Sequence, residues 1–301
     1  MDVGVIGAGT MGKNHVRVYS ELSNVDEVYI YDTNAALAKK VSEQYDAVIC
    51  ELDVLLKSVD AVSICVPTKY HFEVAKMAIE GGVHCLIEKP VAPTSKMGKE
   101  LLKVAGDDLV VGVGHIERFN PIVEEIKKLL KKPRYMGIRR HNPTSSRIND
   151  TDVVTDLMVH DIDLVWNIFM DGKSYDLHSF GDDDLCNAIV RFDRCVVSLS
   201  ASRIACKKMR SIYIEEDGFS VDGDFMNQDV YVYKRPQKYG EVGSRYVEES
   251  VVEKILVNKV EPLKEELRVF VECVKKEEQF PITLEQAVLS LEIAEKIKRA
   301  G

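Results

Sequence analysis

The chain has 301 residues, about twice the usual domain length, so two domains are expected. Its 40 basic and 49 acidic residues give a formal net charge of −9, which argues against nucleic acid or an anionic membrane as the main partner. A composition of 46% hydrophobic and 30% charged residues is typical of a globular protein and excludes disordered and collagen-like folds.

The seven cysteines are odd in number, scattered and free of any C-x-x-C pair, so neither a disulfide framework nor a zinc or other metal site is expected. Such cysteines suit a reducing compartment. A strand-like run begins at Val3, which leaves no room for a signal peptide, and no stretch approaches the roughly 18 apolar residues of a membrane span. We therefore expect a cytoplasmic protein.

Up to about residue 117, short β-branched apolar runs alternate with helical patterns. Strands are expected at 3–6, 27–31, 61–66, 83–87 and 109–113, and helices near 11–23, 34–45, 69–81 and 95–106. Parallel neighbours need crossovers, and right-handed crossovers place helices on both sheet faces. This order predicts an α/β, doubly wound parallel sheet of the Rossmann type over residues 1–118.

Residues 119–301 follow a different pattern, which predicts an α+β domain with an open, mostly antiparallel sheet. Asn120 caps a helix that starts at Pro121 and ends near 132. Strands are expected at 134–142 and, joined by turns at 193–194, 217–218 and 222–223, over 175–233. Helices are expected at 155–169, 262–276 and 284–299, the last opened by a capping box from Thr283 to Gln286, and 234–250 is interpreted as a mobile loop.

The sequence Gly7-Ala-Gly9-Thr10-Met11-Gly12 follows the first strand and opens a helix. Gly7 permits a tight turn, Gly9 lets the main chain approach a pyrophosphate, and Gly12 lets the helix lie close to the strand. Asp32 ends the second strand at the spacing expected for a carboxylate on the adenosine ribose. We expect a dinucleotide site here; the alternative is a glycine-rich turn of purely structural use.

Asp32 also favours NAD over NADP. A 2′-phosphate about 4 Å from this carboxylate would be repelled by about 4 kcal/mol at an effective dielectric constant near 20. No arginine follows in the next residues to offset that repulsion.

Two further segments end strands at the carboxyl edge of the sheet, where ligands of doubly wound folds bind. The first is Pro67-Thr68-Lys-Tyr-His71, and the second is Glu88-Lys89-Pro90, whose lysine is expected near the nicotinamide. His71 could equally be a helix-face histidine without a role, and a charged strand end followed by a turn proline is also common. The expected cofactor-binding residues are therefore Gly7, Gly9, Thr10, Met11, Gly12, Asp32, Pro67, Thr68, His71, Glu88 and Lys89.

On the expected helix 155–169, Asp156 and His160 lie four residues apart on one face, where the carboxylate can orient the imidazole. Such pairs also occur on solvated faces. The apolar residues around Asp156 and His160 predict that this pair is buried. A polar partner or a polar function is then needed to explain a buried Asp–His pair.

Together these motifs resemble the glucose-fructose oxidoreductase, inositol dehydrogenase and MocA (Gfo/Idh/MocA) family over nearly the whole chain. Within that family, the runs 114–121 and 157–163 are most similar to the UDP-N-acetylglucosamine 3-dehydrogenases. The resemblance implies that Lys89 and His160 flank the hydroxyl being oxidised, that Asp156 supports His160, and that the outer face of the second sheet forms a dimer interface. It also implies substrate contacts by Lys89, Glu117, Arg118, Asn120, His160 and Arg203.

The resulting hypothesis is an NAD-dependent dehydrogenase that oxidises a ring hydroxyl of a sugar, most similar to enzymes acting at C3 of UDP-N-acetylglucosamine. A lysine, with an ordinary pKa of about 10.4, suits a clamp on the developing alkoxide, while an imidazole near 6.5 suits proton transfer. Basic residues at 203, 207, 208 and 210 could hold a pyrophosphate or be solvated strand ends. The alternatives are a dehydrogenase of a free sugar or inositol, and a non-catalytic NAD-binding sensor, which has no need of Lys89 and His160.

A homo-oligomer, dimer or tetramer, is expected through the second sheet. In segment 195–201, Cys195, Val197, Leu199 and Ala201 fall on one face, and the small uncharged residues Val196, Ser198 and Ser200 on the other. A second copy would cover the latter face. The alternative is that the C-terminal helices cover one face and segment 234–250 the other.

Overall fold

The structure, a computed structural model, describes residues 1–106, 108–143, 151–170, 174–236, 239–242, 245–248 and 250–300. They form two compact units, Met1–Phe119 with Glu261–Glu292, and Asn120–Val260 with Ile293–Gly301. The first break lies one residue beyond the expected boundary. The assignment of 261–292 to the second domain is wrong, because these residues complete the core of the first unit.

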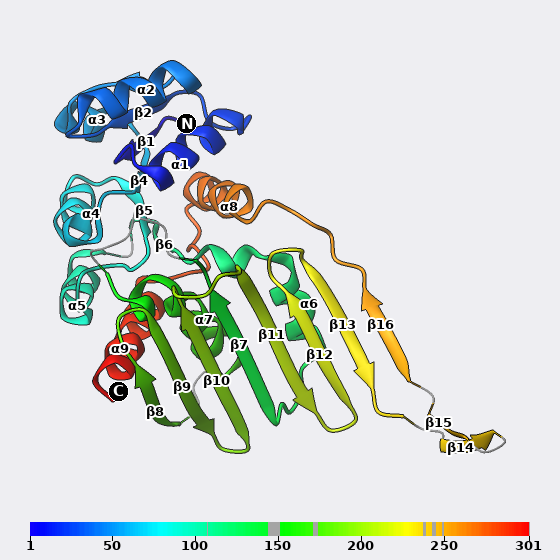
Figure 1. Cartoon of the computed structure of the whole chain (residues 1–301). Helices are drawn as coiled ribbons and strands as arrows, with labels where there is room; N and C mark the ends of the chain where they lie inside the picture. Colours follow the sequence, from blue (N-terminus) through cyan, green and yellow to red (C-terminus); the bar gives the residue numbers. More distant parts are fainter. Residues whose placement is uncertain are drawn as a thin grey trace. The chain divides into compact units, whose positions relative to one another are not determined.

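A six-stranded parallel sheet of order β3-β2-β1-β4-β5-β6 forms the centre of the first unit (Figure 1). Its strands are β1 (Val3–Ile6), β2 (Val28–Tyr31), β3 (Val48–Ile49), β4 (Ala61–Ile64), β5 (His84–Glu88) and β6 (Val111–Gly114). Its helices are α1 (Thr10–Glu21), α2 (Ala35–Tyr45), α3 (Leu52–Ser58), α4 (His71–Glu80), α5 (Ser95–Val104) and α8 (Pro262–Lys276), with 3-10 turns η1 (Thr68–Tyr70) and η2 (Ile116–Phe119). The doubly wound fold is confirmed.

Residues 277–283 show why the end of the chain returns to this unit. The main-chain N–H of Val113 in β6 donates to the carbonyl of Ile282 (3.2 Å). A Cβ on Gly112 would overlap the ring of Phe280, so the glycine lets this segment lie against the strand. Buried Leu267 and Phe270 of α8 belong to the same apolar core as β1 and β4.

The second unit is built on an eight-stranded sheet of order β16-β13-β12-β11-β7-β10-β9-β8, antiparallel except for the β7–β10 pair. The strands are β7 (Tyr135–His141), β8 (Asp176–Gly181), β9 (Leu185–Phe192), β10 (Cys195–Ser202), β11 (Met209–Glu216), β12 (Phe219–Asp224), β13 (Asp229–Lys234) and β16 (Val251–Ile255). The helical segments are α6 (Pro121–Leu129), η3 (Val154–Met158), α7 (Val159–Leu164) and η4 (Val165–Phe169), while α9 (Leu284–Ala300) has its first half in the first unit. The expected open, mostly antiparallel sheet is confirmed.

The turn expected at Asp222-Gly223 is wrong, because both residues lie inside β12 and pair with β11. A Cβ on Gly223 would lie 2.8 Å from the side chain of Ile212 and 3.0 Å from that of Ile126. This glycine therefore marks the close approach of α6 to the sheet. The turn follows Asp224 instead.

The loop expected at 234–250 contains a short hairpin, β14 (Tyr239–Val242) with β15 (Arg245–Glu248), so that expectation is corrected. Residues 237–238, 243–244 and 249 of this segment lie outside the described residues.

The two faces of β10 differ as expected. Val197, Leu199 and Ala201 are fully buried, whereas Val196 is exposed. Figure 1 shows α6 and α7 behind this sheet. Among the described residues, no helix combines the length and the apolar character that crossing a membrane requires.

Candidate functional site

The glycine-rich loop between β1 and α1 has the geometry of a phosphate cradle. Gly7 has φ +104°, and a Cβ there would lie 2.6 Å from the carbonyl oxygen of Cys65. A Cβ on Gly12 would overlap the Gly7 carbonyl, whereas one on Gly9 would meet no atom of the described chain within 4 Å. Gly9 also caps α1 without a side-chain acceptor. The helix N-terminus is thus open to an anion.

Asp32 directly follows β2 and lies beside this loop. Its Oδ2 accepts the main-chain N–H of Ala8 (2.6 Å), and its Oδ1 accepts that of Asn34 (2.7 Å). The carboxylate is half-buried. The structure therefore holds this carboxylate beside the glycine-rich loop.

His71 connects the two strand ends at the carboxyl edge. Its Nδ1 lies 2.7 Å from the carbonyl oxygen of Pro90, and its Nε2 lies 2.8 Å from that of Val66. Burial lowers the pKa of His71, and the two carbonyl contacts only partly oppose this effect. Because a carbonyl oxygen only accepts, the protonated ring nitrogen of His71 donates to one of these carbonyls, and the ring lies between the Val66 and Pro90 segments. Pro67 accepts the N–H of Tyr70 (2.9 Å) and opens η1, in which Thr68 is half-buried.

Glu88 ends β5 and is buried, and Lys89 follows it as a half-buried residue. One oxygen of Glu88 lies 3.0 Å from Nε2 of His15, and the other accepts the main-chain N–H of Lys89 (3.3 Å). Burial raises the pKa of Glu88, but the hydrogen bond from His15 and the nearby charge of Lys89 outweigh this effect, so the net pKa is lowered. Glu88 therefore acts as a carboxylate that fixes the start of the Lys89 segment.

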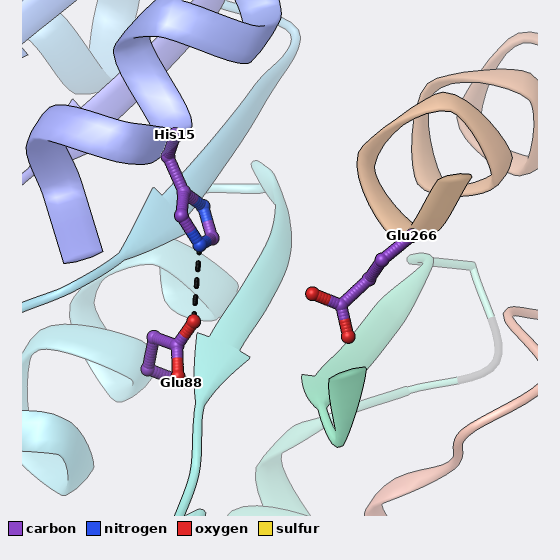
Figure 2. Close-up of side chains that lie close together, drawn as sticks. All are labelled: His15, Glu88 and Glu266. Carbon is purple, nitrogen blue, oxygen red and sulfur yellow. Dashed lines mark hydrogen bonds and ion pairs between the residues drawn. The ribbon is translucent and has the colours of Figure 1, made fainter. Parts of the chain in front are cut away.

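Figure 2 shows His15, Glu88 and Glu266 facing one another. His15 and Glu266 were not predicted from the sequence as site residues. A signal existed for Glu266, which shares a helical stripe with Leu263, Leu267 and Phe270, where a charge is unexpected. His15 follows Gly12 by three residues on α1 and carries no comparable signal.

The second group of expected site residues lies in the other unit. The helix expected at 155–169 contains two π-helical turns, η3 with Asp156 and η4, around α7 with His160. Oδ2 of Asp156 lies 3.5 Å from Nη2 of Arg203, and this nitrogen also donates to the carbonyl of Thr151 (2.5 Å). π-Helical turns occur frequently at functional sites.

The basic residues expected to bind substrate have different environments. Arg203 is buried, whereas Lys207 and Lys208 are exposed. Arg118 donates to Oε1 of Gln286 (2.7 Å), at the start of α9, and the neighbouring Glu117 is buried.

Both ends of the Asn120 side chain contact main chain. Its Oδ1 accepts the N–H of Ile122 (3.4 Å), and its Nδ2 donates to the carbonyl of Phe225 (2.9 Å). The structure thus gives Asn120 a role in anchoring α6.

A buried ion pair in the second unit was also missed. Nη2 of Arg140 lies 2.6 Å from Oδ1 of Asp161, and both side chains are 1% exposed. Arg140 occupies an inward position of β7, in line with Met136 and Ile138. A charge at an inward strand position is the signal that could have identified it.

Comparisons with known proteins agree with this geometry. The model of the Gfo/Idh/MocA oxidoreductase family, with an NAD-binding Rossmann fold, matches residues 1–115. A UDP-N-acetylglucosamine 3-dehydrogenase of Acidithiobacillus ferrooxidans is 34% identical over 245 residues, which cover 78% of this chain and 77% of that protein. An inositol 2-dehydrogenase of Corynebacterium glutamicum is 28% identical over 176 residues, or 54% of this chain and 52% of that one.

Solved structures give the same result over the whole chain. A UDP-N-acetylglucosamine 3-dehydrogenase from Acidithiobacillus ferrooxidans has a TM-score of 0.89 at 30% identity, covering 100% of this chain and 97% of that one. A levoglucosan dehydrogenase in complex with NADH and levoglucosan has a TM-score of 0.83 at 18% identity, covering 100% and 96%, and shares the fold.

Proposed function

Because this chain belongs to the Gfo/Idh/MocA family of oxidoreductases, we propose that it is an NAD-dependent dehydrogenase that oxidises the C3 hydroxyl of UDP-N-acetylglucosamine. The substrate is inferred from the 34% identity to a UDP-N-acetylglucosamine 3-dehydrogenase over 78% of the chain. The inositol dehydrogenase matches about half of the chain at lower identity.

The residues of the first unit fit a dinucleotide. The space above Gly9 and the uncapped start of α1 suit a pyrophosphate, and the Asp32 carboxylate suits the ribose hydroxyls of NAD and repels a 2′-phosphate. Bound NAD supplies the hydride acceptor, the nicotinamide C4. Lys89 is the residue of this unit that we assign to the reacting hydroxyl.

The residues of the second unit supply the base. We assign proton abstraction from the hydroxyl to His160, because an imidazole exchanges protons near neutral pH. Lys89 stabilises the developing alkoxide by its charge. Asp156 orients His160, and the contact of Arg203 with Asp156 adds a second positioning group.

Arg203 is also the residue that we assign to the nucleotide pyrophosphate, since a guanidinium binds phosphate oxygens in pairs. Its burial distinguishes it from exposed Lys207 and Lys208. The seven free cysteines fit a reducing cytoplasm, which we propose as the location.

A substrate panel tests the proposal. UDP-N-acetylglucosamine, free N-acetylglucosamine, UDP-glucose and myo-inositol are each incubated with NAD or NADP, and the formation of reduced cofactor and the loss of two hydrogens by mass are measured. We expect the highest kcat/KM for UDP-N-acetylglucosamine with NAD. A higher kcat/KM for myo-inositol or the free sugar would favour the alternative of an inositol or free-sugar dehydrogenase. If none of the compounds reduced the cofactor, the non-catalytic NAD-binding sensor would be the remaining alternative.

A further inference from the structure

Three buried groups of the first unit converge from three elements that are far apart in the sequence (Figure 2). They are the imidazole of His15 from α1, the carboxylate of Glu88 at the end of β5 and the carboxylate of Glu266 from α8. One ligand-type atom from each lies within 4.8 Å of the others. His15 and Glu266 are 0% exposed, and neither oxygen of Glu266 has a hydrogen-bond partner in the part of the chain that the structure describes.

Of the two carboxylates, Glu88 is the one whose surroundings stabilise a negative charge. Glu88 receives hydrogen bonds from Nε2 of His15 and from the N–H of Lys89. Glu266 receives none from the described residues, and burial and the charge of Glu88 raise its pKa well above the ordinary value. Two ionised carboxylates at this separation in a low-dielectric core would repel each other strongly.

The other titratable groups around the cluster do not reverse this assignment. Burial raises the pKa of the Cys65 thiol, next to β4, and that of the Tyr19 phenol on α1, whose oxygen bonds to Ser63 (2.7 Å). Both groups are uncharged in that state. The η2 turn, which packs on α8, contributes Glu117 and Arg118, and the latter bonds to Gln286.

A proton fits this arrangement better than a metal ion. A histidine that ligates a metal usually donates its other ring N–H to an acceptor. Nδ1 of His15 is buried without a partner among the described residues, and its Nε2 already contacts Glu88. A tautomer with the proton on Nε2 satisfies Glu88 and leaves no buried N–H of this ring unpaired.

We propose that Glu266 is held as a neutral carboxylic acid, and that Glu266 and His15 are positioning residues that fix the carboxylate of Glu88 and, through its bond to the Lys89 N–H, the position of Lys89. A carboxyl oxygen of Glu266 lies within 4.8 Å of a carboxylate oxygen of Glu88, a separation that one water molecule could bridge. The positioning role rests on the proposed function of Lys89; the neutral state of Glu266 does not.

Thermal unfolding against pH tests the neutral state without any substrate. A raised pKa in the folded protein costs no stability below the ordinary glutamate pKa, and stability is lost as pH rises toward the folded value. Glu266→Gln keeps the shape and removes this loss. We therefore expect the Tm of Glu266→Gln relative to the unmodified protein to increase with pH above about 4.5.

The matched control is Glu272→Gln, a partly exposed residue of the same helix paired with Arg268, for which no such increase is expected. We also expect the infrared difference spectrum between the unmodified protein and Glu266→Gln at neutral pH to contain the carbonyl band of a protonated carboxylic acid. A carboxylate band instead, or a stoichiometric metal ion that is lost in Glu266→Gln, would overturn the proposal.

Activity then tests the positioning role. Glu266→Ala is expected to lower kcat about tenfold or more with little change in the KM for NAD, because a shift of about 1 Å in a reacting group has effects of up to a hundredfold. Glu266→Gln should restore most of the kcat. If the conservative variant lost as much kcat as the alanine variant, the positioning role would be refuted even where the infrared result held. An absence of all dehydrogenase activity in the unmodified protein refutes the proposed function instead.

Discussion

Lys89 lies between two main-chain anchors, which makes its position more constrained than that of an ordinary strand-end lysine. Its own N–H donates to Glu88, and the carbonyl oxygen of the next residue, Pro90, lies 2.7 Å from Nδ1 of His71. The side chain that we assign to the developing alkoxide therefore starts from a fixed main chain. Fixed donors and charges stabilise a transition state without reorganisation.

Replacing this side chain tests the assignment. We expect Lys89→Ala and His160→Ala each to lower turnover by a factor of about 10² or more, the range for a lost charge-stabilising or acid-base group, while NAD remains bound and the Tm stays near that of the unmodified protein. If both act on one hydroxyl, as we propose, the double variant should lose less than the product of the two factors. Single-turnover hydride transfer is the measurement.

Lys96→Ala, an exposed lysine at the start of α5, is the control and should retain normal transfer. Near-normal transfer by Lys89→Ala or His160→Ala would show that the assigned role belongs to another residue.

Asp32 tests the choice of cofactor. Asp32→Ala removes both the expected bonds to the ribose and the repulsion of a 2′-phosphate, and it releases the N–H of Ala8 in the glycine-rich loop. We expect NAD to bind about tenfold more weakly and the preference over NADP to narrow. Calorimetric titration with both cofactors measures this, and equal or tighter binding of NADP by the unmodified protein would refute the electrostatic argument.

The position of Asp32 beside the glycine-rich loop could be predicted from the sequence. One strand-helix-strand unit fixes the number of residues between the loop and this carboxylate. His15 and Glu266 were not predicted together, because they are about 250 residues apart and only the folded chain brings them within 4.8 Å. Local periodicity reports which way a side chain faces. It carries no information about its partner across the core.

At the scale of elements, the junction of β1 and α1 separates two functions of its glycines. Gly12 permits the helix to pass the Gly7 carbonyl, whereas Gly9 faces open space. We expect Gly12→Ala to lower the Tm of the protein without cofactor, because a Cβ would force the helix and strand apart. Gly9→Ala should change that Tm by only about 1 °C but weaken NAD binding at least tenfold.

Thermal unfolding without and with NAD distinguishes the two variants, and each serves as the other's control. A loss of Tm in Gly9→Ala without NAD as large as that in Gly12→Ala would mean that both glycines serve only the turn, the structural alternative to a dinucleotide site.

Elements with an uninterrupted apolar pattern could be predicted, and those without one could not. Helix α8 begins and ends where its pattern indicates. Strand β3 has two residues, both exposed, and so carried no signal. The turn expected at Gly223 was wrong, because a glycine in a strand pattern indicates either a turn or the close approach of another element. Only the position of Ile126 from α6 shows that a close approach is the reason here.

At the scale of the whole molecule, the order of the chain does not follow the division into units. Residues 261–292 return to the first unit, where Phe280 packs over Gly112. The end of the first segment of this unit could be predicted to within one residue, because the pattern of strands and helices changes there. Apolar helical stripes, in contrast, do not show which core they complete. A chain truncated near residue 260 would lack part of the core of its first unit.

The outer face of the eight-stranded sheet predicts a homo-oligomer. This face carries exposed apolar and aromatic residues along several neighbouring strands: Phe180, Ile189, Val196, Tyr213, Tyr233 and Val252. Sheets with one face in water usually present polar residues there. An isologous contact between two copies would bury these side chains, which is the commonest way in which soluble chains pair.

A charge introduced on this face tests the contact. Ile189→Asp, on β9 opposite Ser198, should convert the oligomer to a 34 kDa monomer in sedimentation velocity at micromolar concentration, because the contact would have to bury an unpaired carboxylate. Val54→Asp, at an equally exposed apolar position on α3 of the other unit, should leave the oligomer intact. A single monomeric species of the unmodified protein, unaltered by NAD, would mean that the face stays in contact with water or is covered by residues of its own chain, and the apolar side chains would then need another explanation.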